Sequence, residues 1–243
     1  ILCCAALLPL TLTKVPQPET PKAPRLRPRL AFERSPLATA GVVVAALSAA
    51  SFRMVGPLYG QEVGLSVGQI AWFLSAFVLG GALAQYPVGW LADKYDRRWS
   101  LIWLSVAAIF SCGVTVVASG MGTKGIMLTA FLFGLTSFPI FSVATAHAHD
   151  FAKDSERVEL SAALMFYYAL GAIAAPYVAS VLITAYGPSA LFILIAGGHA
   201  LLIIFGLTRM LARPVSNEKT DYVYAPRTSF VIGRLNRRKR QQD

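Results

Sequence analysis

The chain has 243 residues, of which 56% are hydrophobic and only 14% are charged. Soluble domains usually carry roughly a quarter charged residues. Four stretches contain no Asp, Glu, Lys or Arg at all, namely residues 63–92, 99–123, 125–149 and 160–208. Because a helix needs about 20 apolar residues to cross a bilayer, this pattern excludes a soluble enzyme, a secreted disulfide scaffold and a disordered chain. It predicts an all-α polytopic membrane protein.

The first 34 residues divide into an apolar part and a proline-rich part. No basic segment precedes the apolar residues 1–13, which argues against a secretory signal and favours the end of a truncated transmembrane helix. Residues 14–34 carry five prolines and six basic residues. Because proline interrupts helices, we expect this segment to be an extended linker in water.

Six membrane spans are predicted within residues 35–212, separated by charges or turn residues. Tyr186-Gly187-Pro188 divides the longest uncharged stretch, because proline cannot continue a helix and glycine favours its end. The expected spans cover residues 36–59, 67–92, 99–119, 125–149, 160–185 and 189–211. The sequence therefore predicts a six-helix bundle, followed by a basic tail over residues 213–243.

Lys and Arg are distributed unevenly between the two ends of these spans. The linker, the loops 93–98 and 150–159 and the chain from Arg209 onward hold 20 of them, whereas the opposite turns hold only Lys124. Positively charged loops remain in the cytoplasm, so we expect the linker, both loops and the tail to be cytoplasmic. Because the net charge of +10 arises in these loops and tails, it does not indicate nucleic-acid binding.

A charged motif joins the second and third spans. It reads Gly89-Trp90-Leu91-Ala92-Asp93-Lys94-Tyr95-Asp96-Arg97-Arg98. This motif resembles the G-x-L-A-D-R-x-G-R-R loop of the major facilitator superfamily of secondary transporters, with matches at Gly89, Leu91, Asp93, Arg97 and Arg98. Asp96 stands where that family prefers glycine. On physical grounds, Gly89 favours a close helix crossing, and Asp93 can pair with an arginine or a helix N-terminus at the membrane edge.

The resemblance implies both a fold and a mechanism. Members of this family have twelve helices and carry a copy of the loop in each half. A severed helix, a long basic linker and six spans resemble helix 6, the central loop and helices 7–12, so the chain is expected to be the C-terminal half, with a missing N-terminal half as its partner. Residues 138–150 and 168–173 also resemble a bacterial YcaD-like group, which implies the inner membrane. Such proteins carry a small solute by alternating access, and the loop from Gly89 to Arg98 steadies the outward-facing state.

Arg53 is the one full charge that lies away from the ends of a predicted span. Counted from Leu37, it lies roughly 24 Å into a hydrocarbon core about 30 Å thick. A charge at this depth is costly unless it faces water or a partner, which makes Arg53 a candidate substrate-binding residue. The alternative is that its side chain snorkels to the outer headgroups. The resemblance places Arg53 on a cavity-lining helix, where it would favour an anionic substrate.

Other candidate substrate contacts are polar or aromatic residues on helices that the resemblance places beside the cavity: Gln85, Phe138 and Tyr167. Aromatic packing explains the two rings equally well. Helix bends commonly lie at substrate sites in transporters, and Gly134, Pro139, Gly171 and Pro176 are the positions where we expect them.

The sequence predicts no metal site, no cofactor and no enzymatic activity. His147 and His149 lie about 200° apart on a helix, so they cannot chelate one ion together. His199 is expected to be a packing histidine within the last span. No span pairs a nucleophile with a base. The alternative to a transporter is a nontransporting membrane scaffold or receptor that keeps the same fold.

Overall fold

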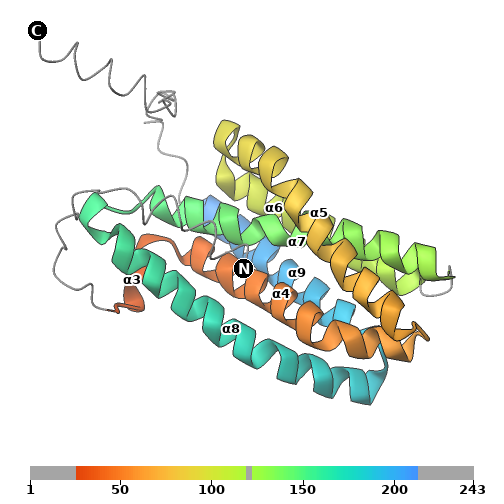
Figure 1. Ribbon diagram of the computed structural model, residues 1–243. Helices are drawn as coiled ribbons and strands as arrows, with labels where there is room; N and C mark the ends of the chain where they lie inside the picture. Colours follow the sequence, from red (N-terminus) through yellow and green to blue (C-terminus); the bar gives the residue numbers. More distant parts are fainter. Residues whose placement is uncertain (1–25, 119–121, 213–243) are drawn as a thin grey trace, which may run out of the picture. The chain divides into compact units, whose positions relative to one another are not determined.

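The structure is a computed structural model that describes residues 26–118 and 122–212 (Figure 1). The predicted membrane segment at 1–13, most of the linker and the tail at 213–243 lie outside the described residues. Within the described residues every regular element is a helix, which confirms the all-α prediction. The elements are α3 Arg29–Arg34, α4 Pro36–Glu62, α5 Val67–Lys94, α6 Arg97–Ala118, α7 Gly122–His149, the short 3-10 helix η1 Asp154–Glu156, α8 Arg157–Tyr186 and α9 Ala190–Ala212.

Six of these helices, α4 to α9, are long and apolar enough to cross a membrane. They contain between 22 and 30 residues each, and about 20 residues suffice for the hydrocarbon core. Each helix lies where a span is predicted, although several continue further than expected. In particular, α5 runs through Lys94 and α6 begins at Arg97, so the predicted charged loop is reduced to two residues.

Local chemistry explains where several helices begin and end. The Ser35 side chain accepts a hydrogen bond from the Ala38 amide, which caps α4. Ser66 and Gln69 form a reciprocal capping box at the start of α5. Gly187 ends α8 with a φ of 86°, a conformation that glycine adopts without steric cost.

The linker contains an element that the sequence does not predict. The expectation that residues 14–34 are extended throughout is wrong for the last six, which form α3. Pro28 is the final proline and lies just before the helix, where the missing N–H is no disadvantage. The side chains of Leu30 and Ala31 are buried against the bundle. Tertiary packing therefore stabilises a helix too short to persist alone.

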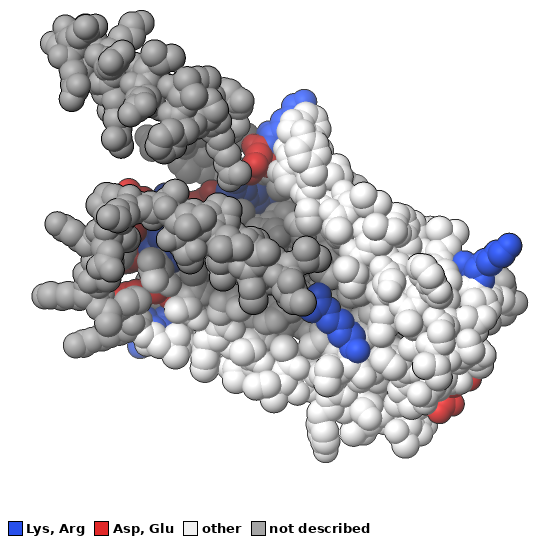
Figure 2. All heavy atoms as spheres, viewed as in Figure 1, with Lys and Arg blue, Asp and Glu red and all other residues white. Residues whose placement is uncertain are grey.

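The bundle has two ends with different chemistry. We call the end where α5 meets α6 and where α7 meets η1 and α8 the basic end, and the end with the α4–α5 and α8–α9 turns the opposite end. Most of the described surface in one view is uncharged, and the charged side chains lie mainly toward its ends (Figure 2).

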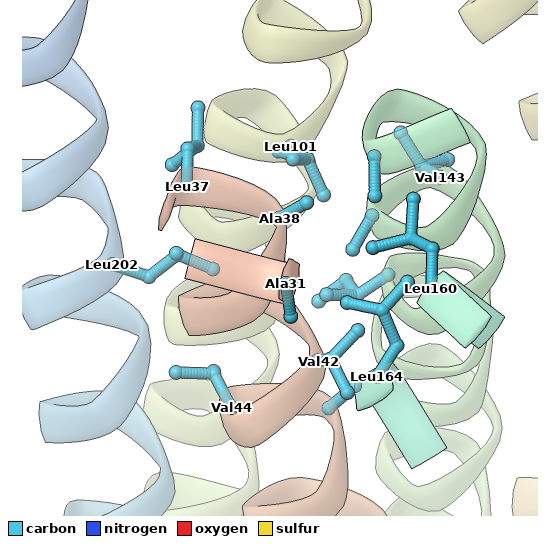
Figure 3. Close-up of a cluster of buried hydrophobic side chains, with 14 of the residues drawn as sticks. Ala31, Leu37, Ala38, Val42, Val44, Leu101, Val143, Leu160, Leu164 and Leu202 are labelled. Carbon is cyan, nitrogen blue, oxygen red and sulfur yellow. The ribbon is translucent and has the colours of Figure 1, made fainter. Parts of the chain in front are cut away.

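Two buried clusters fill the bundle, one toward each end. The cluster toward the basic end, which we call the aliphatic core, is built from small and branched side chains of all six long helices and α3, among them Ala31, Leu37, Val42, Leu101, Val143, Leu160, Leu164 and Leu202 (Figure 3). The cluster toward the opposite end, which we call the aromatic core, contains Phe52, Tyr59, Phe73, Phe77, Phe133 and Phe192.

Glycines bring α5 and α7 into close contact between these cores. A Cβ atom added at Gly134 would lie 2.0 Å from the Phe77 carbonyl oxygen, and one added at Gly80 would lie 2.1 Å from the Phe131 carbonyl oxygen. Only glycine fits such a crossing. At Gly89 no helix of the described residues makes such a crossing, because a Cβ atom there would meet nothing within 4 Å, and the close crossing expected at this glycine stays a prediction.

Candidate functional site

Arg53 projects from α4 over a ring of α7. Its guanidinium carbon lies 5.3 Å from the centroid of the Phe138 ring, which is the geometry of a cation–π contact. The residue is exposed, and no carboxylate of the described residues lies within ion-pair distance of it. Arg53 is therefore a cation held in place by an aromatic ring and left open toward one side of the bundle.

The position of Phe138 shows which way the Arg53 side chain points. Nine residues separate Arg53 from the end of α4 at Glu62, a distance of about 14 Å along the helix. Phe138 packs on Gly81, which lies about 21 Å along α5 from its start at Val67. The guanidinium thus points away from the opposite end and toward the middle of the bundle, which disfavours snorkelling to the headgroups at the opposite end.

Gln85 of α5 meets the same side of α7. The Ser142 hydroxyl donates a hydrogen bond of 3.2 Å to the Gln85 side-chain oxygen, and both residues are exposed at this surface. Phe138 and Ser142 are four residues apart, so they share one face of α7. Phe138 lies on this face, and Arg53 and Gln85 contact it from α4 and α5. Three of the four predicted substrate contacts therefore lie together. The sequence does not single out Ser142, although its spacing from Phe138 could have indicated it.

Tyr167 lies elsewhere. Its half-buried ring makes edge contacts with Phe32 of α3, at 5.0 Å between centroids, and with Phe166, at 5.5 Å. No contact joins it to Arg53 or Gln85 in the part of the chain that the structure describes. Its neighbour Tyr168 instead packs against Phe141 of α7.

The two glycines among the residues predicted to bend α7 and α8 take part in helix packing. A Cβ atom at Gly171 would lie 3.2 Å from the Val43 carbonyl oxygen, so this glycine allows α8 to approach α4 as Gly134 allows α7 to approach α5. Pro139 and Pro176 lie inside helices that continue on both sides of them. The bends themselves remain predictions.

The charged motif forms a three-helix contact at the basic end. Arg97, the first residue of α6, pairs with Asp93 of α5 at 2.7 Å and also with Asp150, just after α7. The same guanidinium donates a hydrogen bond of 3.2 Å to the Ala146 carbonyl oxygen. We call Asp93, Arg97 and Asp150 the arginine clasp. The clasp joins the ends of α5, α6 and α7 through one cation.

Asp96 and Arg98 form a second, local pair. The Asp96 carboxylate accepts a hydrogen bond of 2.9 Å from the Arg98 amide and pairs with the Arg98 guanidinium at the same distance, 2.9 Å. Burial opposes ionisation of Asp96, but the hydrogen bonds from Arg98 outweigh this effect, and the pKa of the carboxyl lies below its ordinary value. Asp96 therefore caps α6, and no described residue other than glycine has a positive φ. The aspartate, which stands where the similar loop prefers glycine, therefore needs no left-handed turn.

Two further ion pairs attach the end of the linker to η1 and the start of α8. Arg34 pairs with Glu156 at 2.6 Å, and Arg27 pairs with Glu159 at 3.2 Å. Together with buried Leu30, they fix α3 at the basic end beside the start of α8.

His199 is a buried packing residue, as the sequence suggests. Its ring nitrogens lie 3.0 Å from the Ser48 hydroxyl and 3.4 Å from the Ser105 hydroxyl, so the side chain joins α9 to α4 and α6. Among residues 26–118 and 122–212, no group of three or more His, Cys, Asp or Glu side chains could hold a metal ion.

Comparison with known proteins agrees with this architecture. Residues 38–240 match the family model of the Major Facilitator Superfamily. An uncharacterized MFS-type transporter of Yersinia pestis (strain Pestoides F) is 27% identical over 219 residues, which is 89% of this chain and 55% of that protein. The uncharacterized MFS-type transporter YcaD of Salmonella heidelberg (strain SL476) is 29% identical over 195 residues, covering 79% and 50%. The chain thus spans about half the length of the curated relatives it matches.

A solved structure shows the same fold. The POT family transporter PepTSo, determined by in meso crystallography, aligns with a TM-score of 0.64 and 18% identity over 80% of this chain and 40% of that one. With six candidate membrane spans and a family model that matches most of its length, the chain is a multi-pass integral membrane protein that belongs to the Major Facilitator Superfamily.

Proposed function

We propose that this chain forms the C-terminal half of a secondary active transporter in the bacterial inner membrane, which moves a small solute by alternating access. Family membership supports the transporter role, and the matched half-length of the relatives supports a second bundle as partner. In this proposal the face of α7 with Phe138 and Ser142 is turned toward the other half, and the basic end is cytoplasmic, as the distribution of Lys and Arg favours.

The proposed class of substrate rests on one observation, which is that the exposed Arg53 side chain lies over the Phe138 ring. A guanidinium inside a membrane span that has no carboxylate partner among the described residues is costly unless its site contains water or an anion. The planar fork of arginine also matches a carboxylate or phosphate with two hydrogen bonds. The Gln85–Ser142 pair beside it supplies neutral donors and acceptors. We therefore assign the solute to small anions.

In this proposal the arginine clasp breaks and reforms when the transporter changes between its outward-facing and inward-facing states. Arg97 holds the ends of three helices through side chains that are 23–60% exposed, so these contacts can break and reform at low cost. One side of α5 has no helix packed on it at this end within the described residues. This side carries Gly89 and Asp93, and a Cβ atom at Gly89 would meet nothing there. In the proposed transporter the other half occupies this side while the outward-facing state persists.

Ligand binding to the full-length protein tests the substrate class directly. The protein, purified in detergent, is screened for a rise in melting temperature with a panel of small carboxylates, phosphate esters and neutral sugars of similar size. We expect stabilisation only by anions, lost in Arg53→Gln and partly retained in Arg53→Lys. Stabilisation by a neutral solute that is unchanged in Arg53→Gln would overturn the assignment.

A further inference from the structure

An apolar groove lies between α5 and α6 at the basic end, away from the substrate face. It has a volume of about 740 Å³. Val88 and Leu91 line it from α5, and Trp99, Trp103 and Leu104 line it from α6. The groove exists because α5 and α6 each pack closely against α7 but hardly touch one another.

The groove opens to the outside of the bundle and not toward the face proposed for the other half. Leu91 is two residues from both Gly89 and Asp93, which corresponds to about 200° of rotation on a helix. It therefore lies on the side of α5 opposite those two motif residues. Trp99 and Trp103 are 45% and 64% exposed. Tryptophan is typical of the membrane–water interface, so this side of α6 is suited to contact lipid.

A lysine side chain lies beside the groove. The Lys94 ammonium lies 5.7 Å from the centroid of the Tyr95 ring, which itself lines the groove, and 5.0 Å from that of Trp90. No carboxylate of the described part of the chain lies within ion-pair distance of Lys94. Asp96 also lines the groove, but its charge is compensated by Arg98.

We propose that this groove binds one anionic phospholipid of the cytoplasmic leaflet, with an acyl chain between α5 and α6 and the phosphate on Lys94. From Asp96 to Leu104 the lining extends about 12 Å along α6, close to the depth of one leaflet of a hydrocarbon core about 30 Å thick. An apolar slot of this length beneath the Lys94 ammonium matches an acyl chain beneath a charged headgroup. The inference does not depend on the identity of the transported solute.

Photocrosslinking in vesicles tests the proposal on the full-length protein. The probes are phosphatidylglycerol and phosphatidylcholine that carry a diazirine on one acyl chain, and adducts are mapped by mass spectrometry of proteolytic peptides. We expect adducts on the peptides that contain Leu91 and Trp103, with about a fivefold preference for phosphatidylglycerol, the factor expected from one cation near an anionic lipid.

Variants locate the charge that sets the preference. Lys94→Gln is expected to remove the fivefold preference and Lys94→Arg to keep it. Lys124→Gln, which removes a lysine near the start of α7 at the opposite end, is the matched control and should change nothing. Equal labelling by the two probes in the unmodified protein would overturn the proposal. So would labelling of the groove peptides no stronger than that of the exposed face of α8, which would mean that protein covers the groove.

Discussion

The two ends of the bundle are built in different ways. Toward the opposite end, large rings interlock: Phe52 stacks on Phe77 at 4.2 Å between centroids and contacts Phe73 and Phe133 at 4.9 and 5.3 Å. Toward the basic end the buried side chains are aliphatic, and charged pairs at the rim join the helices. The proposed substrate face, marked by Phe138, lies between the two.

This difference suggests that the aromatic core keeps the helices in place, whereas the contacts at the basic end can rearrange. Aromatic rings packed from four helices cannot shift without losing many contacts at once, because interiors are close-packed. Partly exposed ion pairs contribute little each and can be exchanged. We expect the aromatic core to remain intact during transport, and the basic end to rearrange. Substitutions at four places in the bundle test this division, and their expected effects decrease in the order given.

The close crossing of α5 and α7 is the feature least tolerant of change. Gly134→Leu places a side chain where even a Cβ atom lies 2.0 Å from the Phe77 carbonyl oxygen, so we expect loss of folded protein. Size-exclusion chromatography of the detergent-solubilised full-length protein measures this loss. The control is Gly89→Ala, whose Cβ atom meets nothing within 4 Å and which should fold as the unmodified protein does. A folded Gly134→Leu variant would contradict the packing described here.

The aromatic core should dominate stability among variants that still fold. Phe52→Ala removes a fully buried ring that contacts four others, and we expect a loss of about 3 kcal/mol in the free energy of unfolding. Denaturant titration in mixed micelles measures it. Phe110→Ala serves as the matched control, since that ring is 69% exposed and its loss should have little effect. Equal losses in the two variants would remove the distinction between core and surface.

The arginine clasp should affect transport more than stability. Arg97→Gln breaks the contacts with both Asp93 and Asp150, whereas Asp93→Asn breaks only one. We expect a clear fall in transport rate for both variants, larger for Arg97→Gln, while expression and membrane insertion persist. Arg29→Gln is the control, because its pairing with Glu33 is long at 3.8 Å and its side chain is 91% exposed. Unchanged transport in Arg97→Gln would exclude a gating role for the clasp.

The docking of α3 should give the smallest effect. In a double-mutant cycle between Arg34→Gln and Glu156→Gln, we expect a small favourable coupling in the unfolding free energy that declines as salt is added, because the pair is partly exposed. Protection of the Leu30 amide from hydrogen exchange offers a second measurement. A coupling as large as the effect of Phe52→Ala would mean that the basic end is as rigid as the opposite end.

The sequence was most informative where a single physical rule decides the outcome. Uncharged stretches of sufficient length predict the six spans, and the Gly187-Pro188 break is found where the pattern places it. The rule for prolines in the linker fails after Pro28, because α3 is stabilised by contacts with η1 and α8, whose residues lie more than 120 positions away in the chain. No local pattern reports such contacts.

The candidate site was predictable only in part, for a related reason. Arg53 is conspicuous because a charge is rare within a span, but its contact with Phe138 depends on how α4 and α7 are oriented. Tyr167 is an aromatic residue with a polar group, as a substrate contact could be, yet its ring packs against Phe32 of α3. Ser142 has no distinguishing feature until Gln85 is placed beside it. Residue type indicates what a side chain can do, while the packing of distant helices decides where it does so.

In the proposed transporter, recognition of an anionic solute is expected to depend most on Arg53. The direct measurement is uptake into vesicles that contain the full-length protein, with the radiolabelled anion that gives the strongest stabilisation in the binding screen. We predict saturable uptake by the unmodified protein, uptake with a raised KM in Arg53→Lys, and uptake close to that of protein-free vesicles in Arg53→Gln. Saturable uptake in Arg53→Gln with an unchanged KM would contradict this role for Arg53.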